Sequence, residues 1–80
     1  MTNSAYLPDP DDLNGCLDHL AEECAETIKA IMKFKRFGAD SINPFLPAEK
    51  QVSNHSRVLL EIDDLRITAG RVEGLLRNKP

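Results

Sequence analysis

The chain has 80 residues, which is enough for a single domain over residues 1–80. Hydrophobic residues make up 41% and charged residues 29%, a balance typical of a folded globular protein and not of a disordered one. The net charge of −3 excludes the basic surface of a typical nucleic-acid binder. No apolar run is long enough to cross a membrane, and the first residues do not resemble a signal peptide. We therefore expect a cytoplasmic protein without a membrane or nucleic-acid partner.

Aromatic residues make up only 5% of the chain and tryptophan is absent, so the core must be built from Leu, Ile, Val and Ala. Such a core suits helices better than a sheet. The two cysteines, Cys16 and Cys24, stand eight residues apart. On one helix they would be separated by a rise of about 12 Å, which is too far for a disulfide, so we expect two reduced thiols.

The first helix is predicted to run from about Pro10 to Phe37, after a loose tail over residues 1–8. Asp9 can cap this helix, Pro10 suits its first position, and Gly38 is a natural stop. Between these ends, side chains that can line one helix face recur in steps of three and four: Leu13, Leu17, Leu20, Cys24, Thr27 or Ile28, Ile31 and Phe34.

Residues 38–53 are rich in loop-forming residues and are predicted to form a loop, either throughout or with a short helical turn after Pro47. Ser53 or Asn54 can cap a second helix. Its apolar stripe comprises Val58, Ile62, Leu65, Ala69, Val72 and Leu76. The expected fold class is all-α, with two long helices in an antiparallel hairpin. Because two helices cannot shield both stripes, we expect a homodimer or tetramer that completes a four-helix bundle.

Each predicted helix carries a pair of carboxylates three residues apart on the flank of its apolar stripe. At 100° per residue, Glu23 and Glu26 lie about 80° and 140° from the middle of the first stripe, on the same side. Glu61 and Asp64 lie about 60° and 120° from the middle of the second stripe, again on one side. Glu22 points away from the first stripe. The helical wheel therefore permits the four flanking carboxylates to share one site.

Four carboxylates in one place repel one another strongly unless a cation lies among them. Oxygen ligands favour Mg²⁺, with Mn²⁺ or Ca²⁺ as alternatives, over Zn²⁺. Bound Mg²⁺ keeps coordination positions for water and for phosphate oxygens. Two other interpretations remain open. The acids could simply be solvated surface groups, or Cys16, His19 and Glu23 could form a zinc face.

The two carboxylate motifs, Glu22-Glu23-Cys24-Ala25-Glu26 and Glu61-Ile62-Asp63-Asp64, resemble the paired motifs of the MazG-like, all-α nucleoside triphosphate pyrophosphohydrolases. The resemblance covers roughly residues 13–76. It implies Mg²⁺-dependent hydrolysis of a nucleoside triphosphate to the monophosphate and pyrophosphate. The implied Mg²⁺ ligands are Glu23, Glu26, Glu61 and Asp64. The resemblance also implies that Glu22 assists near the attacking water.

The chain departs from this family after the second motif, where members often have further helices that hold the base and the phosphates. The cations that remain there are Arg66, Arg71, Arg77 and Lys79. A neighbouring subunit could therefore be required to complete the substrate pocket.

Four residues are candidate contacts for the nucleoside triphosphate: His19, Lys33, Arg57 and Arg71. Cations among them could neutralise phosphates, but they would equally suit surface salt bridges or the negative end of a helix dipole. We expect a magnesium-dependent nucleotide pyrophosphohydrolase that removes aberrant nucleotides from the nucleotide pool. The alternatives are a non-enzymatic helical module that binds a nucleotide or a protein, and a phosphohydrolase acting on an alarmone nucleotide.

Overall fold

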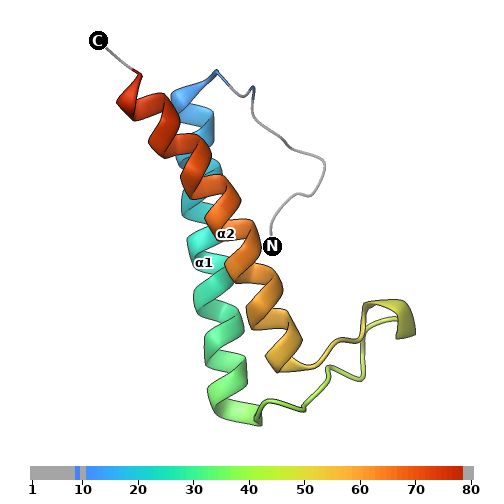
Figure 1. Ribbon diagram of the computed structural model, residues 1–80. Coiled ribbons are helices and arrows are strands. Elements are labelled where there is room, and N and C mark those ends of the chain that lie inside the picture. The colour runs from blue at the N-terminus through green and yellow to red at the C-terminus, as the bar shows by residue number, and fades with distance from the viewer. Residues whose placement is uncertain (1–8, 10, 79–80) are drawn as a thin grey trace.

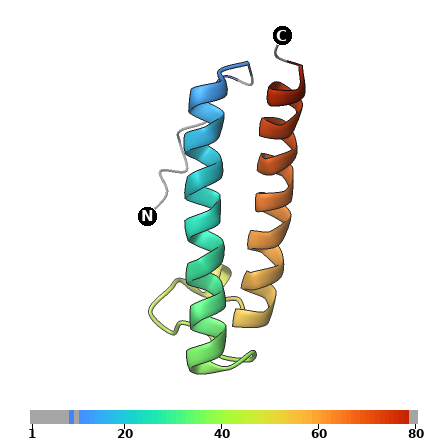
Figure 2. The same cartoon turned by 90° about the vertical axis from the view of Figure 1, so that its left-hand side faces the viewer.

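The computed structural model describes residue 9 and residues 11–78, which form two long helices joined by a loop. α1 comprises Leu13–Phe37, the single-turn 3₁₀ helix η1 comprises Ala48–Lys50, and α2 comprises Asn54–Arg77. The two long helices lie side by side and run in opposite directions, with principal extents of 48 × 23 × 15 Å (Figure 1, Figure 2). The predicted all-α hairpin is confirmed. The predicted tail over residues 1–8 lies outside the described residues.

The start of α1 lies three residues beyond its predicted position. Asp12 occupies the N-cap position, but its side chain makes no capping hydrogen bond. The Asp9 carbonyl accepts a hydrogen bond from the Asp12 N–H (2.9 Å), and the Asp9 side chain accepts one from the Asp11 N–H (3.0 Å). Because these bonds close a turn ahead of the helix, the prediction of Asp9 as the cap was wrong. Pro10 lies outside the described residues.

The loop ends of the two helices agree with the prediction and are tied to each other. Gly38 ends α1 with a φ of 92°, a conformation that strains residues carrying a Cβ. The Asn54 side-chain amide donates to the carbonyls of Lys33 (3.3 Å) and Gly38 (3.0 Å). The Ser53 hydroxyl caps α2 by accepting from the backbone N–H three residues later (3.1 Å). These bonds fix the start of α2 against the end of α1.

The contact between the helices uses a different face of α1 from the predicted apolar stripe. The buried residues of α1 are Gly15, Cys16, Glu23, Thr27 and Ala30. Members of the predicted stripe remain exposed, including Leu17, Ile28 and Ile31. On the helical wheel, the buried face lies about 80° from the middle of the stripe, toward the side that carries Glu23 and Glu26.

α2 shows a similar displacement. Its buried residues, Thr68 and Val72, lie on average about 60° from the middle of the predicted stripe, on the side of Glu61. The predicted stripes line the contact only in part: Thr27 and Val72 are buried there, while larger apolar members of the stripes remain exposed. The observed contact uses mostly small side chains, which let two helices lie close together. Within the described residues, neither helix is long and apolar enough to cross a membrane.

Candidate metal centre

Three carboxylates from the two helices converge at the middle of the seam. One oxygen from each of Glu23, Glu61 and Asp64 lies within 4.8 Å of the other two. Glu23 is buried, Glu61 is half-buried and Asp64 is exposed, so the group opens from the seam to solvent. The antiparallel hairpin sets the middle of α1 beside the middle of α2 (Figure 2). This pairing brings together side chains that are far apart in the sequence.

Glu26 belongs to the same electrostatic group. The pKa of Glu61 is raised above its ordinary value of 4.5, first by burial and then by the negative charge of Glu26. The charges of Glu23 and Asp64 raise that pKa further. Glu26 and Asp64 thus both raise the pKa values of Glu23 and Glu61, although the compact group does not include Glu26. Glu22 is half-buried, and its charge adds to the rise in the pKa of Glu23.

Glu23 has the most buried carboxylate of the group. Its side chain is 10% exposed, and its Oε2 atom is buried without a hydrogen-bond partner among the described residues. Burial raises the pKa of Glu23, and the charge of Asp64 raises it further, while His19 opposes the rise. A buried carboxylate oxygen without a partner is costly, and a divalent cation would satisfy it. The all-oxygen donor set fits Mg²⁺ or Mn²⁺.

Two buried threonines line the seam beside the carboxylates. The Thr27 hydroxyl donates to the Glu23 carbonyl, and the Thr68 hydroxyl donates to the Asp64 carbonyl, each at 2.8 Å. Each hydroxyl is thus satisfied within its own helix, so a small side chain can be buried at the seam without a polar cost. Neither threonine was predicted to belong to the site, although each follows a carboxylate by four residues.

Two of the predicted substrate contacts pair directly with carboxylates of the group. His19 Nε2 lies 3.5 Å from Glu23 Oε1. One guanidinium nitrogen of Arg57 lies 3.9 Å from Glu61 Oε2. Both pairs are four residues apart on one helix, a spacing at which side chains meet. Each basic side chain therefore offsets part of the negative charge of the group.

A cavity of about 260 Å³ opens beside the carboxylates. Its lining residues are His19, Glu23, Asp64, Ile67, Thr68 and Arg71. Two acidic residues, Glu23 and Asp64, thus line the same cavity as Arg71. This charge pattern suits a phosphate group held through a cation on one side and an arginine on the other. Lys33 is not among the lining residues and lies exposed, about 10 Å further along α1 than Glu26.

The thiols do not join the group of carboxylates. Cys16 is fully buried, and its Sγ donates to the Asp9 carbonyl at 3.6 Å, near the start of α1. Cys24 is exposed, and neither Cys16 nor Cys24 forms a disulfide, as predicted. Among the described residues, the potential metal ligands that gather in one place are three carboxylates. The arrangement therefore does not favour the zinc face of Cys16, His19 and Glu23.

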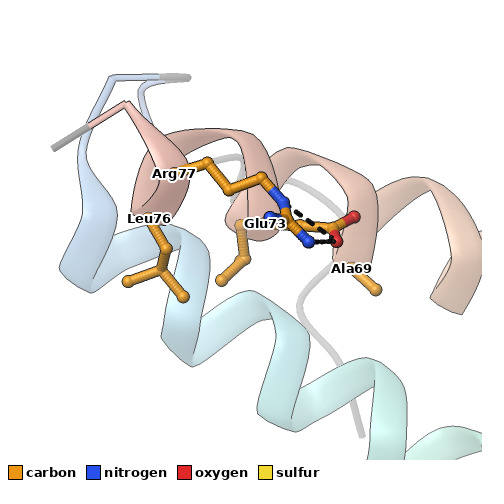
Figure 3. A pocket seen from close by; sticks show the side chains of 5 residues that line it. Ala69, Glu73, Leu76 and Arg77 are labelled. Atoms are coloured by element: carbon orange, nitrogen blue, oxygen red, sulfur yellow. Dashed lines mark hydrogen bonds and ion pairs between the residues drawn. The ribbon is translucent and has the colours of Figure 1, made fainter.

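A larger hollow of about 530 Å³ lies away from the carboxylates, near the C-terminal end of α2 (Figure 3). Its lining residues are Ala69, Val72, Glu73, Leu76 and Arg77. The polar groups drawn there are Glu73 and Arg77, which form an ion pair with each other at 2.8 Å. The hollow is otherwise apolar and offers no second carboxylate, so it is not a candidate for phosphate or metal chemistry.

Comparisons of the chain with models of protein families, with curated proteins and with solved structures found no match. The resemblance to the MazG-like family therefore rests on the two carboxylate motifs of the sequence.

Proposed function

We propose that this chain is a magnesium-dependent nucleotide pyrophosphohydrolase of the MazG-like type. It would convert a nucleoside triphosphate to the monophosphate and pyrophosphate. The observation that carries the proposal is the convergence of Glu23, Glu61 and Asp64, whose oxygens lie within 4.8 Å of one another. Acids on a single helix are commonly solvated, but here two motifs far apart in the sequence supply one group. If these acids were simply solvated surface groups, they would be expected to be exposed, whereas Glu23 is buried in the seam.

The residues proposed to hold Mg²⁺, or Mn²⁺ in its place, are Glu23, Glu26, Glu61 and Asp64. The raised pKa values of Glu23 and Glu61 support this assignment, since they reflect burial and mutual repulsion that a cation would relieve. When bound, the cation would neutralise phosphate oxygens and polarise a water molecule for attack. Asp64, the most exposed of the compact group, would lie nearest to the incoming phosphates.

Glu22, half-buried beside Glu23, is proposed to accept the proton of the attacking water. The water oxygen bonds to the α-phosphorus, the bond from this phosphorus to its bridging oxygen breaks, and pyrophosphate leaves without a covalent intermediate. Arg71 in the cavity is proposed to neutralise the phosphates, with Arg57 and Lys33 acting from the other end of the group.

The proposal is tested by measuring pyrophosphate and monophosphate release from common and damaged nucleoside triphosphates, in Mg²⁺ and in EDTA. Equal amounts of the two products are expected from at least one substrate, and EDTA should abolish both. Glu26→Gln should lower the rate by about 100-fold, because the loss of a group that merely supports a metal ligand already costs about 10–100-fold in metal affinity or activity. Phosphate release from an alarmone nucleotide alone would favour the alternative enzyme. Absence of pyrophosphate from every substrate contradicts the proposal.

The hairpin is proposed to pair with a second copy of itself into a four-helix bundle. Among the described residues, the buried hydrophobic side chains are only Cys16, Ala30 and Val72. Burying one leucine or isoleucine contributes about 1.5–3 kcal/mol, so a core this small supplies little stability. The exposed apolar stripe of α1, which includes Leu17 and Ile28, offers the surface that a partner hairpin would cover.

A second candidate function is a non-enzymatic helical module that binds a protein or a nucleotide. The exposed apolar stripe is the observation that favours it, since such a surface on a small chain marks an interaction site. The Glu26→Gln variant separates the two candidates. Unchanged metal binding and unchanged ligand binding in that variant would support the module over the enzyme.

A further inference from the structure

His19 has a contact that its predicted role as a substrate ligand does not explain. Its Nε2 lies 3.5 Å from Glu23 Oε1, and its side chain is 15% exposed. The other ring nitrogen, Nδ1, is buried and has no hydrogen-bond partner among the described residues. One nitrogen is therefore engaged with a carboxylate and the other is closed to solvent. Neither nitrogen is presented to a nucleotide.

The same contact determines what the Glu23 carboxylate can do. Oε1 faces the imidazole, while Oε2 is buried and has no hydrogen-bond partner among the described residues. Rotation of a carboxylate about its terminal torsion is soft, so an unrestrained group would present either oxygen or neither. The contact of His19 Nε2 with Oε1 restricts this freedom and leaves Oε2 as the oxygen available to a ligand.

We infer that His19 is a positioning residue: through Nε2 it holds Glu23 Oε1 and so presents the other Glu23 oxygen to a divalent cation. The inference rests on the proposed metal centre, but not on the identity of the substrate. Polar groups that orient metal ligands in this way change metal affinity by about 10–100-fold when they are removed. His19 therefore acts on the cation through Glu23, without touching the cation or the nucleotide.

Mn²⁺ binding to the full-length chain, followed by the electron paramagnetic resonance of free Mn²⁺, tests the inference with three variants. His19→Ala removes the Nε2 contact with Glu23 and should weaken Mn²⁺ binding by about tenfold. His19→Gln places an amide N–H near the position of Nε2 and should restore most of the affinity. His55→Gln changes the other histidine of the chain, which is exposed, and should leave the affinity unchanged.

Circular dichroism and thermal unfolding of each variant give the readout of structure. The inference is supported if His19→Ala loses affinity and His19→Gln regains it while the two unfold at similar temperatures. It is overturned if His19→Ala binds Mn²⁺ like the wild type, if both His19 variants lose affinity equally, or if the wild type binds no Mn²⁺. Failure of the proposed function alone has a different signature: Mn²⁺ binding follows the expected order, but no nucleoside triphosphate releases pyrophosphate.

Discussion

Glu23 and Glu61 carry carboxylates into the seam between α1 and α2, where two helices usually bury apolar side chains. Burial is the largest cause of the raised pKa of both residues, and neighbouring carboxylates are the next. His19 lies 3.5 Å from the Glu23 carboxylate and Arg57 lies 3.9 Å from that of Glu61, and the two offset only part of this repulsion. Without a cation, the carboxylates in the seam therefore destabilise the folded state.

The metal-free protein is expected to lose stability as the pH rises. The pKa values of Glu23 and Glu61 are higher in the folded state than the ordinary value of 4.5. The folded state thus binds these protons more tightly than the unfolded chain. The resulting stabilisation is complete below pH 4.5 and is lost as the pH rises through the raised pKa values.

Other carboxylates titrate in the same range, so the measurement is a difference between two proteins. Thermal unfolding in EDTA is followed against pH for the wild type and for Glu23→Gln/Glu61→Gln. The midpoint of the wild type should fall relative to the double variant as the pH rises, and Mg²⁺ should reverse the fall in the wild type alone. A wild-type midpoint that rises relative to the double variant has the wrong sign for this explanation.

Glu61→Gln is predicted to stabilise the apo protein while it weakens metal binding. The substitution keeps the shape of the side chain and removes a charge that burial and Glu26 disfavour. Each kcal/mol recovered raises the unfolding midpoint by about 4–8 °C in a domain of this size. Calorimetry in EDTA and in Mn²⁺ measures both effects. Glu49→Gln, an exposed glutamate outside the group, is the control and should change neither. A lower midpoint for Glu61→Gln in EDTA would contradict the prediction.

Ser53 and Asp12 hold equivalent positions at the starts of α2 and α1, but with different chemistry. Both are N-cap residues, but only the Ser53 hydroxyl accepts a capping hydrogen bond. Ser53→Ala should therefore destabilise the protein by about 1 kcal/mol, a typical cost for loss of a cap. Asp12→Ala should cost less than about 0.5 kcal/mol, as expected for an exposed position. Urea unfolding of the two variants gives the comparison, and equal losses would show that the Ser53 bond contributes nothing.

Local chemistry made the ends of most elements predictable. Gly38 was predicted to end the first helix and Ser53 or Asn54 to cap the second; the structure ends α1 at Gly38 and caps α2 with Ser53. The start of α1 was less determined, because several of the residues around it can cap a helix or close a turn. In the structure, the Asp9 carbonyl of this turn also accepts a hydrogen bond from the Cys16 thiol, a contact that the sequence pattern does not reveal.

The rotation of the helices could not be predicted from periodicity. The wheel placed the carboxylates on the correct flank but assumed that the largest apolar side chains face the other helix. Small residues such as Ala30 and Thr68 form the seam instead, and this choice depends on how both helices fit together. The rotation moves Glu23 and Glu61 from the flank to the centre of the contact. The threonine bonds were missed for the same reason, since they matter only at a buried seam.

The hairpin as a whole has two unlike surfaces. The carboxylates open to solvent beside the seam, while the predicted stripe of α1 leaves Ile28 61% exposed and Leu17 40% exposed. Exposed apolar side chains along most of a helix are costly in a monomer and ordinary in a bundle. The apolar stripe displaced from the seam is thus the surface proposed for a second hairpin.

Ile28→Asp is predicted to convert the assembly to a monomer. The substitution places a charge on the stripe proposed to be covered by the partner, where burial without a counter-charge is strongly unfavourable. Leu59→Asp is the matched control, because Leu59 is 53% exposed and lies about 140° around α2 from the buried Val72. Light scattering after size-exclusion chromatography should give a multiple of the chain mass for the wild type and for Leu59→Asp. A wild-type protein that is monomeric at high concentration would exclude the bundle.

The metal centre itself is tested most directly by the anomalous scattering of Mn²⁺ in crystals grown with a non-hydrolysable nucleoside triphosphate. The expected result is an anomalous peak at coordination distance from oxygens of Glu23, Glu61 and Asp64, with phosphate oxygens on its open side. A protein saturated with Mn²⁺ that shows no peak among these carboxylates, or shows its peak elsewhere, would contradict the proposed centre.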